Sequence, residues 1–387
     1  MIDQCVADVG EREATQLCRR IIGRHRPGPD VVDQLQQPGF VHAPILAGGR
    51  RACAEEWARG DARGVECGRA RPGARPSLGD MTRIGFLGPL GTFTEQALQS
   101  QPDLAAAELV LFRTMPDVLD AVGSGEVDLG FVAIENSIEG AVNLTQDELA
   151  FNHELLIQRE VVLDIEHCLL AKPGTKLDDI KVVMSIPVAT AQCHAYLREL
   201  VGHADVRAAN STADAARLVA EMGPGAAAIA PRTAAVLYGL EVVAADIADH
   251  PGNQTRFVLV ARSGVPARTG HDRTALVVYQ RADEPGSLIS ILQEFAARRI
   301  NLSNLISRPT KDGGLGDYCF ILYADGHVAD ELLADAMRAL HSKQGRVKFL
   351  GSYPAAGADA HEAREHADAR WRDADDWVRA LRHQIVD

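Results

Sequence analysis

Residues 251–260 read PGNQTRFVLV, and this stretch decides how the rest of the chain is arranged. A Pro-Gly-Asn turn leads past Thr255 and Arg256 into a run of strand-forming residues. Before this point the chain has left one group of alternating strands and helices for another. A strand here therefore indicates a return to the first group, and we predict two lobes with a cleft between them. Thr255 and Arg256 stand at the mouth of the returning strand, where a loop can present catalytic groups.

Both lobes are expected to be α/β, because short strands alternate with helices. RIGFLG at residues 83–88 predicts the first strand, and the glycine-rich turn after it leads into a helix that Thr92 or Thr94 caps. The further strands are expected at residues 108–112, 128–134, 181–185, 206–210, 226–230 and 256–262. The helices are expected at residues 116–125, 188–200, 211–222 and 231–239. Between the lobes, residues 162–174 predict two extended segments that cross from one to the other.

A smaller unit at residues 274–354 shows the order strand, helix, strand, strand, helix, strand. In its first helix Leu288, Ile291, Leu292 and Phe295 recur at helical spacing. This βαββαβ order predicts an antiparallel sheet with helices packed on one face. We thus expect a two-lobed catalytic domain at residues 83–262, resembling periplasmic binding proteins, and a ferredoxin-like domain after it.

The two ends of the chain look unlike the rest. Residues 1–80 hold 12 Arg, no Lys and four of the seven Cys, with no sustained hydrophobic period. They are expected to be either a disordered extension or sequence that precedes the true start at Met81. Residues 355–387 form a polar tail, in which Trp371, Trp377 and Leu381 give at most a weak amphipathic helix.

Composition excludes several classes of protein. With 46% hydrophobic and 24% charged residues among 387, the chain reads as a soluble globular protein. It has no apolar run long enough for a membrane span and no signal peptide, so we expect a cytoplasmic protein without a membrane partner. A net charge of −13 argues against nucleic acid. No CxxC or HExxH motif occurs, and we predict no metal.

Polar residues follow several of the predicted strands, where α/β sheets place their ligands. GPLGT at 88–92 could offer backbone N–H groups to an anion or be a plain turn. Ser211 and Thr212 could bind a ligand or cap the next helix. Arg256 could clamp a carboxylate or form a buried ion pair. The Thr255 hydroxyl fits an elimination better than a hydrolysis, since no convincing His–Asp partnership occurs and His167, His194, His203 and His250 are scattered.

The ordered motifs resemble those of the prephenate dehydratases, followed by an ACT regulatory domain. The resemblance covers residues 83–354 and rests on GPLGTFTEQA (88–97), IENSIEG (134–140), AQC (191–193), NSTADAA (210–216), YGL (238–240), NQTRFVLV (253–260), DEPGSLISIL (283–292) and NLSNLISRPTKDGGLGDYCF (301–320). It implies that the substrate prephenate loses carbon dioxide and water to give phenylpyruvate in phenylalanine biosynthesis. It also implies no cofactor.

The resemblance also assigns residues. Thr255 is implied to assist departure of the substrate's hydroxyl. The residues implied to bind the substrate are Gly88, Gly91, Thr92, Glu135, Asn136, Ser137, Ser185, Gln192, Ser211, Thr212, Asn253, Arg256 and Phe257. The residues implied to bind L-phenylalanine as the effector are Pro285, Gly286, Ser287, Leu288, Asn301, Leu302, Ser307, Arg308 and Pro309. A homodimer or homotetramer formed through ACT domains is implied as well.

The chain departs from the family pattern at two places. Where many members read SHPQA, this chain reads SIPVA at 185–189, so the His and Gln of that motif are absent. Where the family reads ESRP, Ile306 replaces the acid, and contacts to the effector's ammonium group are expected to be weaker. Two alternatives remain open: an arogenate dehydratase, and a non-catalytic amino-acid sensor built on the same two-lobed plan.

Overall fold

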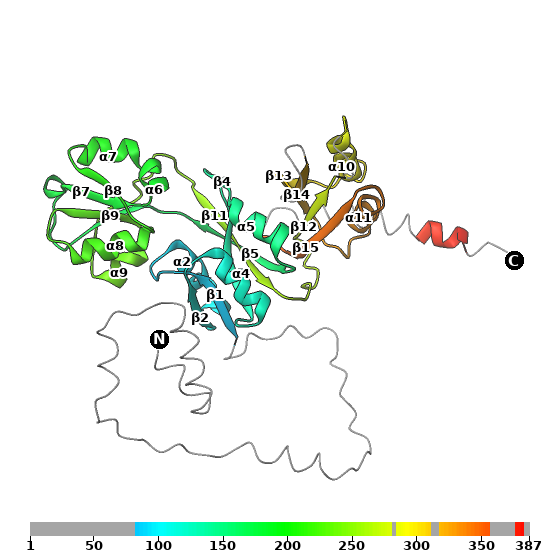
Figure 1. Cartoon of the computed structure of the whole chain (residues 1–387), viewed down its shortest axis with the longest axis horizontal. Coiled ribbons are helices and arrows are strands. Elements are labelled where there is room, and N and C mark those ends of the chain that lie inside the picture. The colour runs from blue at the N-terminus through cyan, green and yellow to red at the C-terminus, as the bar shows by residue number, and fades with distance from the viewer. Residues whose placement is uncertain (1–81, 281–283, 311–316, 357–375, 383–387) are drawn as a thin grey trace, which may run out of the picture. The chain divides into compact units, whose positions relative to one another are not determined.

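The computed structural model describes residues 82–280, 284–310, 317–356 and 376–382 (Figure 1). The predictions for residues 1–80 lie outside these ranges, as does Trp371 in the tail. Residues 376–382 form one short helix, on which Trp377 and Leu381 are exposed.

The first lobe is built on a mixed sheet whose strand order is β2-β1-β3-β11-β5. The strands are β1 (Arg83–Leu87), β2 (Glu108–Phe112), β3 (Leu129–Asn136), β5 (Leu156–Asp164) and β11 (Gln254–Ala261), with the short β4 (Gly140–Ala141) beside β3. The helices are α2 (Phe93–Gln99), α3 (Pro102–Ala105), α4 (Met115–Ser124), α5 (Asn143–Asp147) and the π-helical turn η4 (Glu148–Asn152). Helices α2 and α3 pack on one face of this sheet, and α4 and α5 on the other.

The second lobe has its own sheet in the order β10-β6-β9-β7-β8. Its strands are β6 (Cys168–Ala171), β7 (Val182–Ser185), β8 (Asp205–Ala208), β9 (Ala226–Ala230) and β10 (Glu241–Ala244). Its helices are α6 (Pro187–Gln192), α7 (His194–Val201), α8 (Thr212–Glu221) and α9 (Arg232–Tyr238), with the 3-10 turn η5 (Leu177–Asp179). The central β9 is buried along its whole length, because helices cover both faces of the sheet.

The return of the chain to its first sheet is confirmed. Strand β11 lies between β3 and β5 and runs antiparallel to both. The chain crosses between the lobes at residues 165–167 and again at residues 245–253. The two-lobed α/β architecture predicted from the sequence is therefore the one observed.

The βαββαβ unit is also confirmed, as an antiparallel sheet of order β13-β14-β12-β15. Its elements are β12 (Asp272–Tyr279), α10 (Ser287–Ala296), β13 (Leu302–Pro309), β14 (Tyr318–Asp325), α11 (Glu331–Lys343) and β15 (Arg346–Pro354). Helices α10 and α11 cover one face. The other face packs on the first lobe, where Val277 and Ile321 share a core with Ile157 and Val258.

Some local predictions were confirmed and others were wrong. Thr92 caps α2 and Ser211 caps α8, each accepting a backbone N–H three residues on. The single helix expected at residues 188–200 is two helices, α6 and α7, which break at Cys193, where the backbone leaves the helical region. The sequence did not predict α3, β4, α5, η4, η5 or β10. The predicted domain bounds, 83–262 and 274–354, stay predictions.

Candidate active site

Four predicted site residues meet where the two lobes join. Antiparallel pairing sets Thr255 at the start of β11 opposite Asn136 at the end of β3. The Asn136 amide Nδ2 donates to Thr255 Oγ1 at 2.9 Å and to Asn253 Oδ1 at 2.8 Å. Because the amide is a donor to Thr255, it leaves the threonine's own hydroxyl hydrogen available to another group.

The second lobe supplies Gln192 from the end of α6. Its Oε1 accepts from Asn253 Nδ2 at 3.1 Å, and its Nε2 donates to Glu139 Oε1 at 2.9 Å. Gln192 and Asn253 are both buried. One amide side chain thus contacts the returning loop and the turn after β3, and it joins the two lobes next to Thr255.

His167 also belongs to this network, although the sequence did not predict it as a site residue. It lies in the segment that crosses between the lobes, and its Nε2 is 3.0 Å from Gln192 Oε1. Its ring also meets Phe93 edge-on, with 5.4 Å between centroids. Burial lowers the pKa of His167 below 6.5, and the hydrogen bond with Gln192 opposes this only in part. The neutral ring therefore donates its Nε2 hydrogen to Gln192. Its position in the segment that crosses between the lobes was the feature of the sequence that could have predicted its place near the site.

The glycine-rich turn at residues 88–92 packs against α9 of the second lobe. Gly91 has φ +85°, and a side chain there would meet Ala234 and Leu237 at 3.3–3.4 Å. Tyr238 donates its hydroxyl hydrogen to the Leu90 carbonyl at 3.1 Å. The Gly91 N–H donates to the carboxylate of Glu95. This turn therefore joins the first lobe to α9 of the second.

Arg256 and Glu135 lie on the other side of their strands from Thr255 and Asn136, as neighbours in a strand do. Arg256 Nη1 is 3.2 Å from Glu135 Oε2, and its Nε is 3.8 Å from Glu160 Oε2. The structure thus shows the ion pair that was one of the two readings of Arg256. Phe257 is 1% exposed and stacks on Phe131 in the core.

Three of the remaining predicted substrate residues have protein partners for their side chains. The Ser185 hydroxyl is fully buried and donates to the Ile229 carbonyl at 2.7 Å. The Ser137 hydroxyl accepts from the Gln254 N–H at 2.9 Å, and Ser211 caps α8. Thr212 is the first residue of α8 and is buried. The structure gathers Asn136, Gln192, Asn253 and Thr255 most closely, and the roles of all these residues stay predictions.

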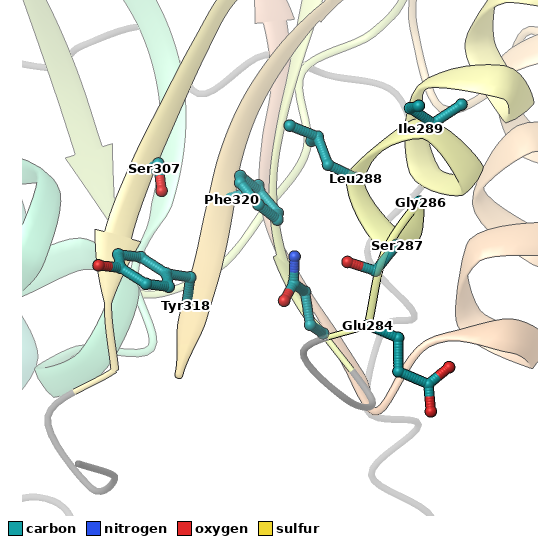
Figure 2. Close-up of a pocket in the computed structure, with 9 residues that line it drawn as sticks. Glu284, Gly286, Ser287, Leu288, Ile289, Ser307, Tyr318 and Phe320 are labelled. Atoms are coloured by element: carbon teal, nitrogen blue, oxygen red, sulfur yellow. The ribbon is translucent and has the colours of Figure 1, made fainter. Parts of the chain in front are cut away.

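The smaller domain has a cavity of about 300 Å³ between α10 and the sheet (Figure 2). Ser287 and Leu288 from the start of α10 point toward Phe320 of β14, while Tyr318 begins the same strand and Ser307 lies on the neighbouring β13. The lining residues are Gln280, Glu284, Gly286, Ser287, Leu288, Ile289, Ser307, Tyr318 and Phe320. Glu284 is the one acid among them.

Four of the predicted effector residues line this cavity: Gly286, Ser287, Leu288 and Ser307. Pro285 lines a neighbouring cavity of about 510 Å³. The other four lie elsewhere. Asn301 donates to Asp325, and Arg308 forms an ion pair with Asp147. Leu302 packs against the core beneath the helices of this domain, and Pro309 is the last residue of β13. The sequence did not predict the other five lining residues, which are Gln280, Glu284, Ile289, Tyr318 and Phe320.

Comparison with known proteins identifies the two domains. Residues 84–264 match the family model of prephenate dehydratase, and residues 274–342 match that of the ACT domain. The prephenate dehydratase of Mycolicibacterium vanbaalenii is 43% identical over 288 residues, which are 71% of this chain and 91% of that protein. The chain belongs to the prephenate dehydratase family. It is therefore an enzyme, a carbon–oxygen lyase that carries an ACT domain. Membership of this family argues against the alternative of a non-catalytic amino-acid sensor.

Solved structures agree with this assignment. The prephenate dehydratase of Arthrobacter aurescens in complex with L-Phe is 41% identical, with a TM-score of 0.71 over 78% of this chain and 99% of that one. GqqA, described as a novel type of quorum-quenching acylase, is 30% identical, with a TM-score of 0.64 over 71% of this chain and 98% of that one. No helix in the described ranges is both long and apolar enough to span a membrane.

Proposed function

We propose that the enzyme converts prephenate to phenylpyruvate, carbon dioxide and water, a step in L-phenylalanine biosynthesis. The observation that carries the proposal is the contact of the Asn136 amide with Thr255 Oγ1, where both lobes meet. In the reaction the bond from the ring to its carboxyl group breaks, and its electrons form the aromatic ring as the C–O bond breaks. The departing oxygen takes a proton and leaves as water.

Thr255 is the group we expect to assist that departure. The Asn136 N–H at its oxygen polarises the hydroxyl and directs its hydrogen away from Asn136. A threonine hydroxyl is too weak an acid to act unaided, but aromatisation supplies most of the driving force. Thr255 then needs only to hydrogen-bond the leaving oxygen and pass it a proton that solvent restores.

The likeness to an acylase raises acyl hydrolysis as another use of this cleft. Hydrolysis through Thr255 would need a base to take its proton. The Asn136 amide donates a hydrogen to Thr255 and cannot accept one through the same nitrogen. The network in the described residues therefore supports elimination better than acyl transfer.

We further propose that L-phenylalanine inhibits the enzyme by binding in the cavity between α10 and the ACT sheet. The cavity has an apolar side, formed by Leu288 and Phe320, for a phenyl ring. Glu284 offers a carboxylate to the effector's ammonium group. Assembly of two or four copies through ACT domains and a cytoplasmic location remain expectations.

The first prediction tests Thr255 by steady-state turnover of prephenate and of arogenate by the full chain. We expect Thr255→Ala to lower kcat roughly 10²–10⁴-fold with binding of substrate retained, because a proton donor to the leaving group is lost. The matched variant Thr255→Ser keeps the hydroxyl and should retain much of the activity. If the folded wild type turned over neither substrate, the proposed function would be wrong.

A further inference from the structure

Strand β13 of the ACT sheet presents its residues alternately to two different neighbours. Ser307 lines the cavity on the side of α10, opposite Phe320. Asn304, Ile306 and Arg308 face the first lobe, where Ile306 packs into the core shared by the two domains. The replacement of the family's acid by Ile306 thus falls on the face that meets the lobe rather than among the residues that line the cavity.

Asn304 connects this face to the active site. Its Nδ2 donates to Glu135 Oε1 at 2.8 Å, and the other oxygen of Glu135 lies 3.2 Å from Arg256 Nη1. Glu135 immediately precedes Asn136, and Arg256 immediately follows Thr255. The Glu135 and Arg256 side chains are 28% and 24% exposed, so the contact is mostly shielded from water.

Two other contacts join the same face of the ACT sheet to α5, which follows the end of β3. Arg308 binds both carboxylate oxygens of Asp147 at 2.6 and 2.7 Å. Tyr323 of β14, the cross-strand partner of Asn304, donates to Gln146 Oε1 at 2.8 Å. Gln146 in turn donates to the Ile134 carbonyl at 3.3 Å. More than one set of contacts therefore connects the ACT domain to the end of β3.

We propose that Asn304 is a positioning residue for the dehydratase reaction and the point through which the effector reaches the active site. It holds Glu135 and, through Glu135, the guanidinium of Arg256, and so fixes the strand ends that carry Asn136 and Thr255. A ligand bound beside Ser307 displaces β13 and alters this contact on the strand's opposite face. The inference rests on the proposed function, because its readout is turnover of the same substrate.

The test compares full-length wild type with Asn304→Ala, measuring kcat, KM and inhibition by L-phenylalanine. A hydrogen bond to a charged group is lost, so we expect kcat to fall roughly tenfold with KM changed less than about twofold. Calorimetric titration should show that L-phenylalanine still binds, while its effect on turnover is largely lost. Ser303→Ala, which removes a hydroxyl that donates to the Tyr323 carbonyl within the ACT sheet, is the matched control and should behave as wild type.

Two more variants guard against a purely structural effect. Asn304→Asp is isosteric and sets a carboxylate against Glu135, so it should impair turnover at least as much as Asn304→Ala. In a Glu135→Ala background, Asn304→Ala should have little further effect, because the contact that it removes is already gone. Wild-type turnover and inhibition in Asn304→Ala and Asn304→Asp would overturn the inference and leave the proposed function standing. An inactive wild type would instead overturn the proposed function.

Discussion

His167 is a residue of the candidate site whose protonation the fold alters. Burial holds its pKa below 6.5, so the folded protein keeps the ring neutral while an unfolded chain would protonate it. Above pH 6.5 the ring is neutral in both states and this difference contributes nothing. As the pH falls below 6.5, the unfolded state binds the proton first, and the free energy of unfolding drops until the folded-state pKa is reached.

We predict that His167 accounts for part of the decrease in the free energy of unfolding at acid pH. Urea denaturation of wild type and His167→Gln, measured between about pH 7.5 and pH 5, should show the wild type losing stability faster as the pH falls. The other histidines are the same in both proteins, so their effect on stability cancels when the two curves are compared. Parallel curves for the two proteins would contradict the assignment.

The direction in which each side chain points explains which site residues could be predicted from the sequence and which could not. Thr255 and Asn253 were picked from one motif, and both are in the network with Asn136. Arg256 came from the same motif but faces Glu135, because adjacent strand residues point to opposite sides. A motif names the residues of a strand, and it does not say which face meets the cleft.

Among the elements, β15 and β5 approach each other closely across the domain boundary, and Gly351 makes this possible. Its φ is +135°, and a Cβ there would lie 2.5 Å from the Ile157 carbonyl oxygen. We expect Gly351→Ala to cost at least about 2 kcal/mol of unfolding free energy, from backbone strain and the clash together. Chemical denaturation measures this.

Gly223→Ala is the matched control, because no atom lies within 4 Å of a Cβ placed there and its backbone is not left-handed. It should be neutral or slightly stabilising. Equal effects of the two substitutions would show that the close approach of β15 to β5 is not needed.

Element prediction failed where tertiary contacts override local preference. The break between α6 and α7 at Cys193 and the π-helical turn at residues 148–152 have no strong local signal. Both are held by long-range partners: Asp249 accepts the backbone N–H groups of Ala195 and Tyr196, and Lys348 of β15 donates to the carbonyls of Ala150 and His153. Neither partner can be found from a window of sequence.

For the molecule as a whole, a buried ion pair joins the dehydratase and ACT domains. Arg273 Nη1 lies 2.7 and 2.6 Å from the two oxygens of Glu160, whose side chain is 1% exposed. Burial opposes the charge of Arg273, but the Glu160 carboxylate outweighs this and raises the pKa of the guanidinium. The pair also lies next to Arg256, and so links the domain interface to the ion pair behind Thr255.

We expect Arg273→Met to lower the free energy of unfolding by about 3–5 kcal/mol, because the Glu160 carboxylate loses its closest partner while still buried. Replacing both residues, as in Arg273→Met with Glu160→Leu, should recover part of that loss. Guanidinium chloride denaturation of the three proteins measures the difference. A double variant less stable than Arg273→Met alone would contradict this account.

The sequence by itself determined the order of most strands and of the longer helices, the two lobes, the βαββαβ unit and the family, because hydrophobic period, turn residues and ordered motifs are local properties of the chain. Only the tertiary structure decided that the ACT sheet packs on the first lobe, that Arg256 meets Glu135, and that Asn304 of one domain holds a residue of the other. These contacts join residues far apart in sequence. Their formation depends on how the faces of sheets are buried against one another, which no short stretch of sequence specifies.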